Sequence, residues 1–213
     1  MYTREAIYNF IKKSLIVFAG MFLLGIGVNF VLIANIGTDA VTAMVIGVYN
    51  LIGNVSFGTA QIIFGVIFVG TGFLINRRKV GVGTVIATFA AGYFIDLFKP
   101  LIVQLVPTEQ TLLTSIGILL IGLIINGIAI AIYLSADFGI GAGEILAVIV
   151  SEKMNWQFRY VKIGSDILML LFGFLCGAVI GVGTIISALI IGPIVQAVMP
   201  FAKKFLNPDR TIL

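Results

Sequence analysis

The chain has 213 residues, of which 60% are hydrophobic and 10% are charged, with a formal net charge of +4 and no histidine. Soluble globular proteins have roughly 45–50% apolar and about 25% charged residues, so a soluble or disordered chain is excluded. The missing histidine excludes histidine-based catalysis and metal binding, and the single Cys176 cannot form an intrachain disulfide. The composition therefore predicts an all-α polytopic membrane protein with the lipid bilayer as a partner and no nucleic-acid partner.

Six apolar stretches are long enough to cross a bilayer as helices, which takes roughly 20 residues. The segment before them, 1–13, mixes apolar side chains with Arg4, Lys12 and Lys13 and predicts an interfacial amphipathic helix. Two more apolar stretches are shorter than a full span, and each follows a break that contains glycine. The six predicted spans are 14–34, 57–75, 82–102, 114–134, 162–180 and 183–202, and the two short stretches are 38–52 and 140–151.

The two halves of the sequence resemble each other. The segment GVGTVIATFAAG at 81–92 matches GVGTIISALIIG at 181–192 with an offset of 100. Weaker matches upstream keep offsets of 101 and 102, as insertions or deletions in loops would produce. The chain is therefore predicted to contain membrane repeat 1 at 14–106 and membrane repeat 2 at 107–201, followed by a basic cytoplasmic tail at 202–213.

The lysines and arginines indicate how these repeats are oriented. If the two short stretches are re-entrant and six helices span, 12 of the 13 basic residues lie inside, together with both termini. If all eight stretches span in a 4+4 arrangement, residues 77–79 move outside and the split becomes 10 to 3. The positive-inside rule favours six spans, with three crossings per repeat and therefore inverted repeats. The eight-helix alternative stays open.

The last helix of each repeat carries small and polar residues at every fourth position, which places them on one helix face. This face predicts either a packing seam, where 82–102 and 182–202 cross near Gly92 and Gly192, or a site for a solute or ion. A carboxylate at hydrocarbon depth costs about 2.5–3.5 kcal/mol, so Asp96 needs a partner such as Lys99, water or a solute. The candidate binding residues on these faces are Thr84, Thr88, Asp96, Thr184 and Gln196.

The glycine-containing breaks form a second candidate site. Broken helices at matching positions of two repeats mark the substrate site in secondary transporters, and Gly37 matches Gly139. The alternative is a pair of surface turns with helix caps. The candidates here are Asn35, Asp39, Asp137 and Glu144. Asp166, four residues after Lys162, is a candidate ion ligand or the partner of that lysine.

A row of glycines at every fourth position, Gly173, Gly177 and Gly181, predicts another close-packing face. Such a face can lie within the chain or join two copies in a homodimer.

The chain resembles the YczE/YyaS/YitT-type family of bacterial integral membrane proteins over residues 14–201. The resemblance rests on Asn35-Ile36-Gly37-Thr38-Asp39, on Ser56-Phe57-Gly58-Thr59, and on the Gly-x-Gly-Thr motif followed by Gly92 and Asp96. It implies a compact helical bundle in a bacterial inner membrane. It supplies no catalytic residues.

These features predict a secondary transporter or channel for a small, unidentified solute, with its site between the two repeats. Two alternatives are a membrane-embedded solute-binding subunit of a larger transporter and a non-transport accessory or scaffold protein. The sequence has no phosphate-binding GxxxxGK[ST] motif, no HExxH motif and no nucleophile motif. We therefore expect no enzymatic activity, no cofactor and no metal site.

Overall fold

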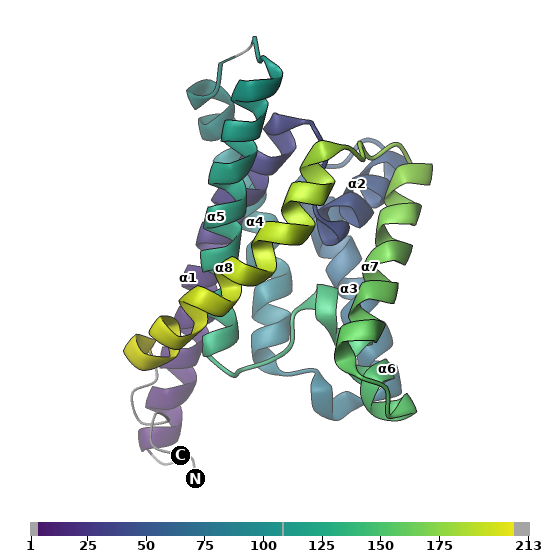
Figure 1. Ribbon diagram of the computed structural model, residues 1–213. Helices are drawn as coiled ribbons and strands as arrows, with labels where there is room; N and C mark the ends of the chain where they lie inside the picture. Colours follow the sequence, from purple (N-terminus) through teal and green to yellow (C-terminus); the bar gives the residue numbers. More distant parts are fainter. Residues whose placement is uncertain (1–3, 108, 207–213) are drawn as a thin grey trace.

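The computed structural model describes residues 4–107 and 109–206, which form a bundle of α-helices without a strand (Figure 1). The prediction of an all-α protein is confirmed, and the observed helices follow the predicted stretches closely. The elements are α1 (Arg4–Ala34), α2 (Ala40–Ile52), α3 (Phe57–Ile75), the 3₁₀-helix η1 (Arg77–Lys79), α4 (Val82–Leu105), α5 (Leu112–Ser135), α6 (Ala142–Met154), α7 (Phe158–Leu175) and α8 (Val182–Leu206).

Five of the described helices are long and apolar enough to cross a membrane, namely α1, α3, α4, α5 and α8. The sixth predicted span corresponds to α7, which has 18 residues but carries Arg159, Lys162 and Asp166 in its first half. The two short stretches form α2 and α6, each of 13 residues. A helix of that length rises only about 20 Å, which is less than the hydrocarbon thickness.

The segment predicted as a separate interfacial helix is continuous with the first span. Helix α1 runs from Arg4 to Ala34 without a break near residue 13, because the sequence offers no glycine or proline before Gly20. At the other end of the chain, α8 continues to Leu206, and the rest of the predicted basic tail lies outside the described residues.

The basic residues gather at one end of the molecule. The first turn of α1, η1, the α6–α7 connection and the last turn of α8 all lie at the lower end in Figure 1, which we call the basic end. The α1–α2, α2–α3, α4–α5 and α7–α8 connections lie at the opposite end. The short helix α2 therefore belongs to the upper half of the bundle, and α6 belongs to the lower half.

The centre of the bundle is the crossing of α1 and α5, where glycines allow close approach. A Cβ atom added at Gly27 would lie 2.9 Å from the Gly122 carbonyl oxygen, and one added at Gly122 would lie 2.8 Å from the Gly27 carbonyl oxygen. Helix α4 is tied to α1 by Asn29, a buried residue whose amide donates a 2.8 Å hydrogen bond to the Ile95 carbonyl. These contacts set the positions of α4 and α5, which both line the cavity described below.

Each helix break packs against the other half of the chain. The Gly183 N–H donates to the Ile36 carbonyl over 2.9 Å, so the α1–α2 break is seated on the start of α8. The Gly83 N–H donates to the Phe138 carbonyl over 3.1 Å, so the α5–α6 break is seated on the start of α4. A Cβ atom at Gly183 or Gly83 would collide with those same carbonyls. Both breaks are therefore held in the interior by backbone contacts.

The predicted crossing of 82–102 and 182–202 near Gly92 and Gly192 is wrong. Helix α4 packs on α1 and α3, whereas α8 packs mainly on α5. A Cβ atom at Gly92 would collide with the Gly58 carbonyl and Ile62 of α3, but one at Gly192 would meet open space. The four-residue spacing correctly defines a close-packing face on α4, but its partner is the preceding helix. Helices α7 and α8 diverge from their connection and do not form the matching contact (Figure 1).

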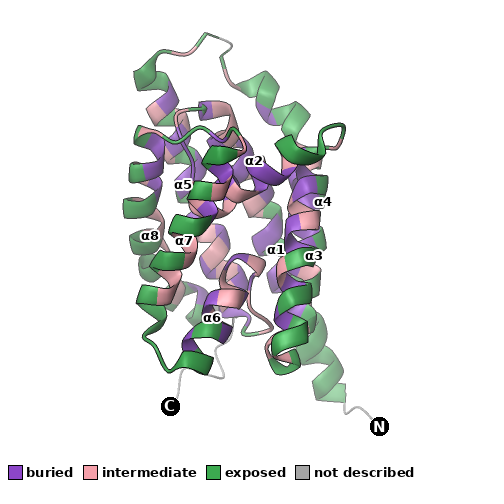
Figure 2. Ribbon diagram, turned by 90° about the vertical axis from the view of Figure 1, so that its right-hand side faces the viewer, coloured by how far each residue is buried: buried purple, intermediate pink, exposed green. Residues whose placement is uncertain are grey.

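The outer surface is apolar, as contact with lipid requires. Figure 2 shows exposed residues along the outer faces of α3, α7 and α8, with buried residues concentrated toward the middle. Leu74, Leu113 and Leu175 are each more than 70% exposed. Hydrocarbon is as apolar as these side chains, so their exposure costs nothing in a bilayer.

The predicted glycine row is used within the chain. A Cβ atom at Gly173 would collide with Ala43 of α2, and one at Gly181 would lie 2.7 Å from the Ile36 carbonyl oxygen. Gly177 lies against Asn50 of α2. Gly173 of α7 and Gly177 of the α7–α8 connection thus lie against α2, while Gly181 lies against the α1–α2 break.

Exchanging each glycine of the matched pair for alanine tests this packing. We expect Gly92→Ala to destabilise the protein by roughly 1–3 kcal/mol, because the new methyl group forces α3 and α4 apart. Gly192→Ala is the control, with the same change at the equivalent position of α8; it should leave stability unchanged or raise it, since alanine favours the helix. Thermal unfolding of both variants in detergent measures the difference. Equal destabilisation by the two substitutions would contradict the open geometry at Gly192.

Candidate functional site

A cavity of about 420 Å³ lies in the middle of the bundle and is lined by residues of all eight α-helices. Small-molecule sites usually occupy roughly 300–1,000 Å³. Most of the wall is apolar and is formed by side chains such as Met21, Leu24, Val28, Phe64 and Ile130. The cavity reaches Gly192 between α7 and α8, whereas Gly58 and Gly92 of the closed α3–α4 contact do not line it.

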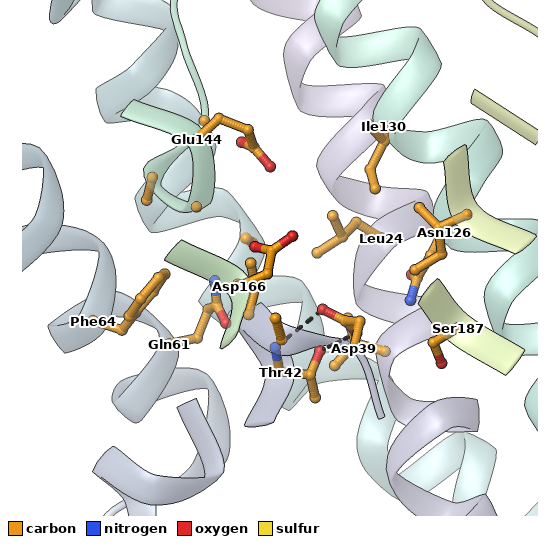
Figure 3. A pocket seen from close by; sticks show the side chains of 18 of the residues that line it. Leu24, Asp39, Thr42, Gln61, Phe64, Asn126, Ile130, Glu144, Asp166 and Ser187 are labelled. Atoms are coloured by element: carbon orange, nitrogen blue, oxygen red, sulfur yellow. Dashed lines mark hydrogen bonds between the residues drawn. The ribbon is translucent and has the colours of Figure 1, made fainter. Parts of the chain in front are cut away.

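Four charged residues line this cavity: Asp39, Glu144, Asp166 and Lys162. They come from α2 or its N-cap, α6 and α7, and Figure 3 shows the carboxylates of the three acidic residues pointing into a common space. Three carboxylates and one ammonium group give a formal net charge of −2. Charge in a low-dielectric interior is costly without compensation, so the site favours a positive occupant.

Asp39 is held in place as the N-cap of α2. One carboxylate oxygen accepts the Thr42 N–H over 3.1 Å, and the other accepts the Thr42 hydroxyl over 2.7 Å (Figure 3). This satisfies a backbone donor that the first turn of a helix leaves unpaired. Helix caps at the breaks were the alternative to a binding site in the sequence, and here the carboxylate that caps α2 also lines the cavity.

Glu144 occupies the first turn of α6, so it sits near the positive end of that helix dipole. The Tyr133 hydroxyl of α5 donates to its carboxylate over 3.3 Å. Glu144 lines the same cavity as Lys162, Asp166 and Asp39. Both short helices therefore direct a carboxylate into the cavity from their N-terminal ends.

Lys162 and Asp166 form an ion pair across one turn of α7, with 2.5 Å between Nζ and Oδ1. The structure confirms this predicted pairing and also places both side chains on the cavity wall. The only ammonium group among the described lining residues is thereby engaged by a neighbouring carboxylate. Asp39 and Glu144 have no such basic partner among the described residues.

Neutral polar side chains complete the lining. Thr88 and Thr184 were predicted, whereas Gln61, Asn126 and Ser187 were not. Asn126 is 4% exposed, and its carboxamide oxygen has no hydrogen-bond partner among the described residues. A buried polar atom without a partner costs about 1–3 kcal/mol. In the sequence, Asn126 stands out only as an amide in the apolar stretch 114–134.

The other predicted site residues lie outside this cavity. Asn35 and Asp137 end α1 and α5 with left-handed φ angles of 48° and 46°. Asparagine and aspartate tolerate that conformation better than other residues with a Cβ, which explains their presence at matching positions. Thr84 is buried against Gly139, and Gln196 is exposed on α8. Asn35 lines a separate cavity of about 230 Å³ at the end opposite the basic end.

Asp96 also lies away from the cavity. Its carboxylate accepts hydrogen bonds from the Ser56 hydroxyl and, over 2.8 Å, from the Gly58 N–H. It therefore stabilises the N-terminal turn of α3 and joins α4 to α3. Of the predicted grouping of Asp96, Thr84, Thr88 and Gln196 around one cavity, only Thr88 is found there. The expected pairing of Asp96 with Lys99 is replaced by these contacts with α3.

Comparison with known proteins places the chain among membrane proteins. Residues 11–200 match the model of a family of unknown function, DUF6198. The chain belongs to this family. Among its relatives, the uncharacterized membrane protein YczE of Bacillus subtilis (strain 168) is 28% identical over 191 residues, which cover 89% of this chain and 86% of the relative. No solved structure matches the chain.

Two further relatives have similar coverage. The uncharacterized protein YyaS of Bacillus subtilis (strain 168) is 24% identical over 90% of this chain and 94% of the relative. An uncharacterized protein of Haemophilus influenzae (strain ATCC 51907 / DSM 11121 / KW20 / Rd) is 26% identical over 86% of this chain and 81% of the relative. The matches to YczE and YyaS confirm the resemblance drawn from the motifs around residues 35–39, 56–59 and 81–96.

Two substitutions at Asp39 of this DUF6198 protein separate capping from charge. Asp39→Ala removes the cap and should destabilise the protein by about 0.5–2 kcal/mol. Asp39→Asn keeps a capping oxygen and removes only the charge, so its stability should stay close to that of the parent. Thermal unfolding of the two variants in detergent measures the effect. Equal destabilisation by both would show that the charge of Asp39, rather than its cap, stabilises the fold.

Proposed function

We propose that this membrane protein transports a small solute through the central cavity. The observation that carries the proposal is the group of charged side chains inside a helical bundle whose outer surface is apolar. Ionisable residues at membrane depth are costly, and they usually line a pathway for an ion or a solute. A scaffold protein would gain more stability from apolar residues at these positions.

Inverted repeats are the second part of the proposal. The short helices α2 and α6 have the same length, and they lie toward opposite ends of the bundle (Figure 1). One backbone hydrogen bond holds each break in place, from Gly183 to Ile36 and from Gly83 to Phe138. The two bonds involve residues at matching positions of the two halves. These features support two repeats related by an axis in the membrane plane, as in several families of secondary transporters.

A difference between the proposed repeats suggests how the cavity opens. In the first repeat, Gly58 and Gly92 bring α3 and α4 into close contact, and Asp96 strengthens that contact. In the second repeat, the equivalent Gly192 faces open space, and the cavity reaches it. In this conformation the cavity therefore extends to the α7–α8 side of the bundle and stops short of the α3–α4 contact. If α3 and α4 separated while α7 and α8 came together, the cavity would be exposed to the other side of the membrane.

We further propose a bacterial inner-membrane location with the basic end in the cytoplasm. Arg77, Arg78 and Lys79 form η1, which lies at the same end of the bundle as the first turn of α1 and the last turn of α8 (Figure 1). Positively charged segments of inner-membrane proteins stay mainly on the cytoplasmic side. This orientation puts both ends of the described chain in the cytoplasm.

Thiol labelling at Asn76 tests the orientation. In a Cys176→Ala background, Asn76→Cys should react with a membrane-impermeant maleimide only in inside-out vesicles. These vesicles expose to the medium the cytoplasmic side of the membrane, where η1 is proposed to lie. A cysteine at Gly53, in the α2–α3 connection at the opposite end, is the control and should react only in right-side-out vesicles. Reaction of the cysteine at position 76 in right-side-out vesicles would contradict the proposed orientation.

A cysteine inside the cavity tests transport itself before any substrate is known. Ala188 lines the cavity and is small and exposed, so Ala188→Cys should be tolerated. If the open α7–α8 side and the closed α3–α4 contact exchange, a water-soluble thiol reagent should reach this cysteine from either side of the membrane. Leu189→Cys, at an exposed neighbouring residue outside the cavity lining, is the matched control for reaction through lipid.

The labelling pattern separates a transporter from a scaffold. Access from both sides, with the control cysteine unreactive, supports transport. Labelling of the cysteine at position 188 from one side only, under all conditions of voltage and ion gradient, would contradict alternate opening of the α7–α8 and α3–α4 sides. That result would favour a one-sided binding or accessory protein.

A further inference from the structure

We infer that the central cavity binds a small organic cation, an alkylamine or quaternary ammonium compound whose charge lies between Asp39 and Glu144. The inference rests on the proposed function, since it names the class of solute for the same site. Its first basis is the formal charge of −2 on the lining, which remains uncompensated once Lys162 is paired with Asp166. A bound cation offsets that charge in a region of low dielectric.

A second observation is the size and the neutral polar lining of the cavity. Its volume of about 420 Å³ is within the range usual for small-molecule sites. Gln61 lines the cavity beside Asp166 (Figure 3), and its carboxamide can hydrogen-bond a bound ligand or an ordered water next to it. The cavity thus offers room, charge and hydrogen-bonding groups to an occupant.

The walls favour an organic cation over a metal ion. Calcium takes 6–8 oxygen ligands and magnesium an octahedral shell, but no group of three or more His, Cys, Asp or Glu among residues 4–107 and 109–206 is placed to hold a metal ion. The apolar side chains Leu24, Val28 and Ile130 instead suit a hydrocarbon body. The rings of Phe64 and Tyr133 also line the cavity and can attract a cation at close range.

An anion is disfavoured by the same geometry. The ammonium group of Lys162 is the only positive charge among the described lining residues, and Asp166 is 2.5 Å from it. An anion would have to displace Asp166 while approaching Asp39 and Glu144. Repulsion of this kind against the wrong ligand is a common source of specificity.

Three four-carbon probes of the same shape test the inference: butylammonium, butanol and butyrate. Equilibrium dialysis of the purified full-length protein in a non-ionic detergent, with each probe radiolabelled, measures binding. We expect saturable binding of butylammonium, and neither butanol nor butyrate should compete at equal concentration. Glu144→Gln should weaken butylammonium binding by at least about tenfold, because a buried charge loses its partner.

Matched variants keep the test independent of folding. Glu152→Gln makes the same change on the same helix, but Glu152 pairs with Lys79 outside the cavity, so butylammonium binding should equal that of the parent. Asp39→Asn keeps the helix cap and should weaken binding as Glu144→Gln does. Circular dichroism confirms that each variant is folded before dialysis.

The outcomes separate this inference from transport. Saturable binding of butyrate, absence of saturable butylammonium binding by the folded parent, or equal binding by Glu144→Gln and Glu152→Gln would each overturn the cation site. These results would leave the labelling of Ala188→Cys from both sides, and hence transport, intact. Conversely, butylammonium binding with one-sided labelling would keep the cation site and contradict transport.

Discussion

Hydrocarbon cannot hydrogen-bond or solvate a charged side chain, and the arrangement of this protein follows from that constraint. Large apolar side chains cover the outside of the bundle, while Asp39, Glu144, Lys162 and Asp166 turn inward around one cavity. The remaining basic residues gather mainly at one end, where headgroups and water can solvate them. The cavity is thus the place within the membrane region where several charged side chains gather, and only Lys162 and Asp166 among them form an ion pair.

The breaks in the helices place these charges in the interior, because each break ends one helix and begins the next one beside the cavity. Asn35 and Asp137 end α1 and α5 in a left-handed conformation, which frees the next helix to begin in the interior. That new N-terminus presents unpaired N–H groups and the positive end of the helix dipole. Asp39 accepts a hydrogen bond from one of these N–H groups, and Glu144 lies in the first turn of α6, where the dipole favours a negative charge. The acidic lining is therefore a consequence of where the helices start, and a fully continuous bundle would not provide it.

The sequence predicted the helices and the two breaks well, because each depends on local patterns: apolar length, glycine, and capping residues. Asp39, Glu144, Asp166, Thr88 and Thr184 were chosen as candidates from such local patterns, and all five line the central cavity. Asp96 was misplaced because four-residue spacing identifies a helix face but not the neighbour that covers it. Its partner, the N-terminal turn of α3, depends on the Gly58–Gly92 contact, which only the packed structure reveals. Asn126 carries no local signal beyond its polarity.

Helix α8 has a proline in its middle, at a position where its counterpart α4 has none. Pro193 lies directly after Gly192, whereas α4 has Tyr93 at the equivalent position. A proline inside a helix leaves the carbonyl four residues earlier, that of Leu189, without its usual donor. Ile194, directly after this point, packs against Gly127 of α5, so a bend at Pro193 would change how the second half of α8 lies on α5. Pro100 of α4 lies beyond the cavity-lining residues of that helix, whereas Pro193 of α8 directly follows the cavity-lining Gly192. A bend at Pro193 would therefore reshape the wall of the cavity, and a bend at Pro100 would leave it in place.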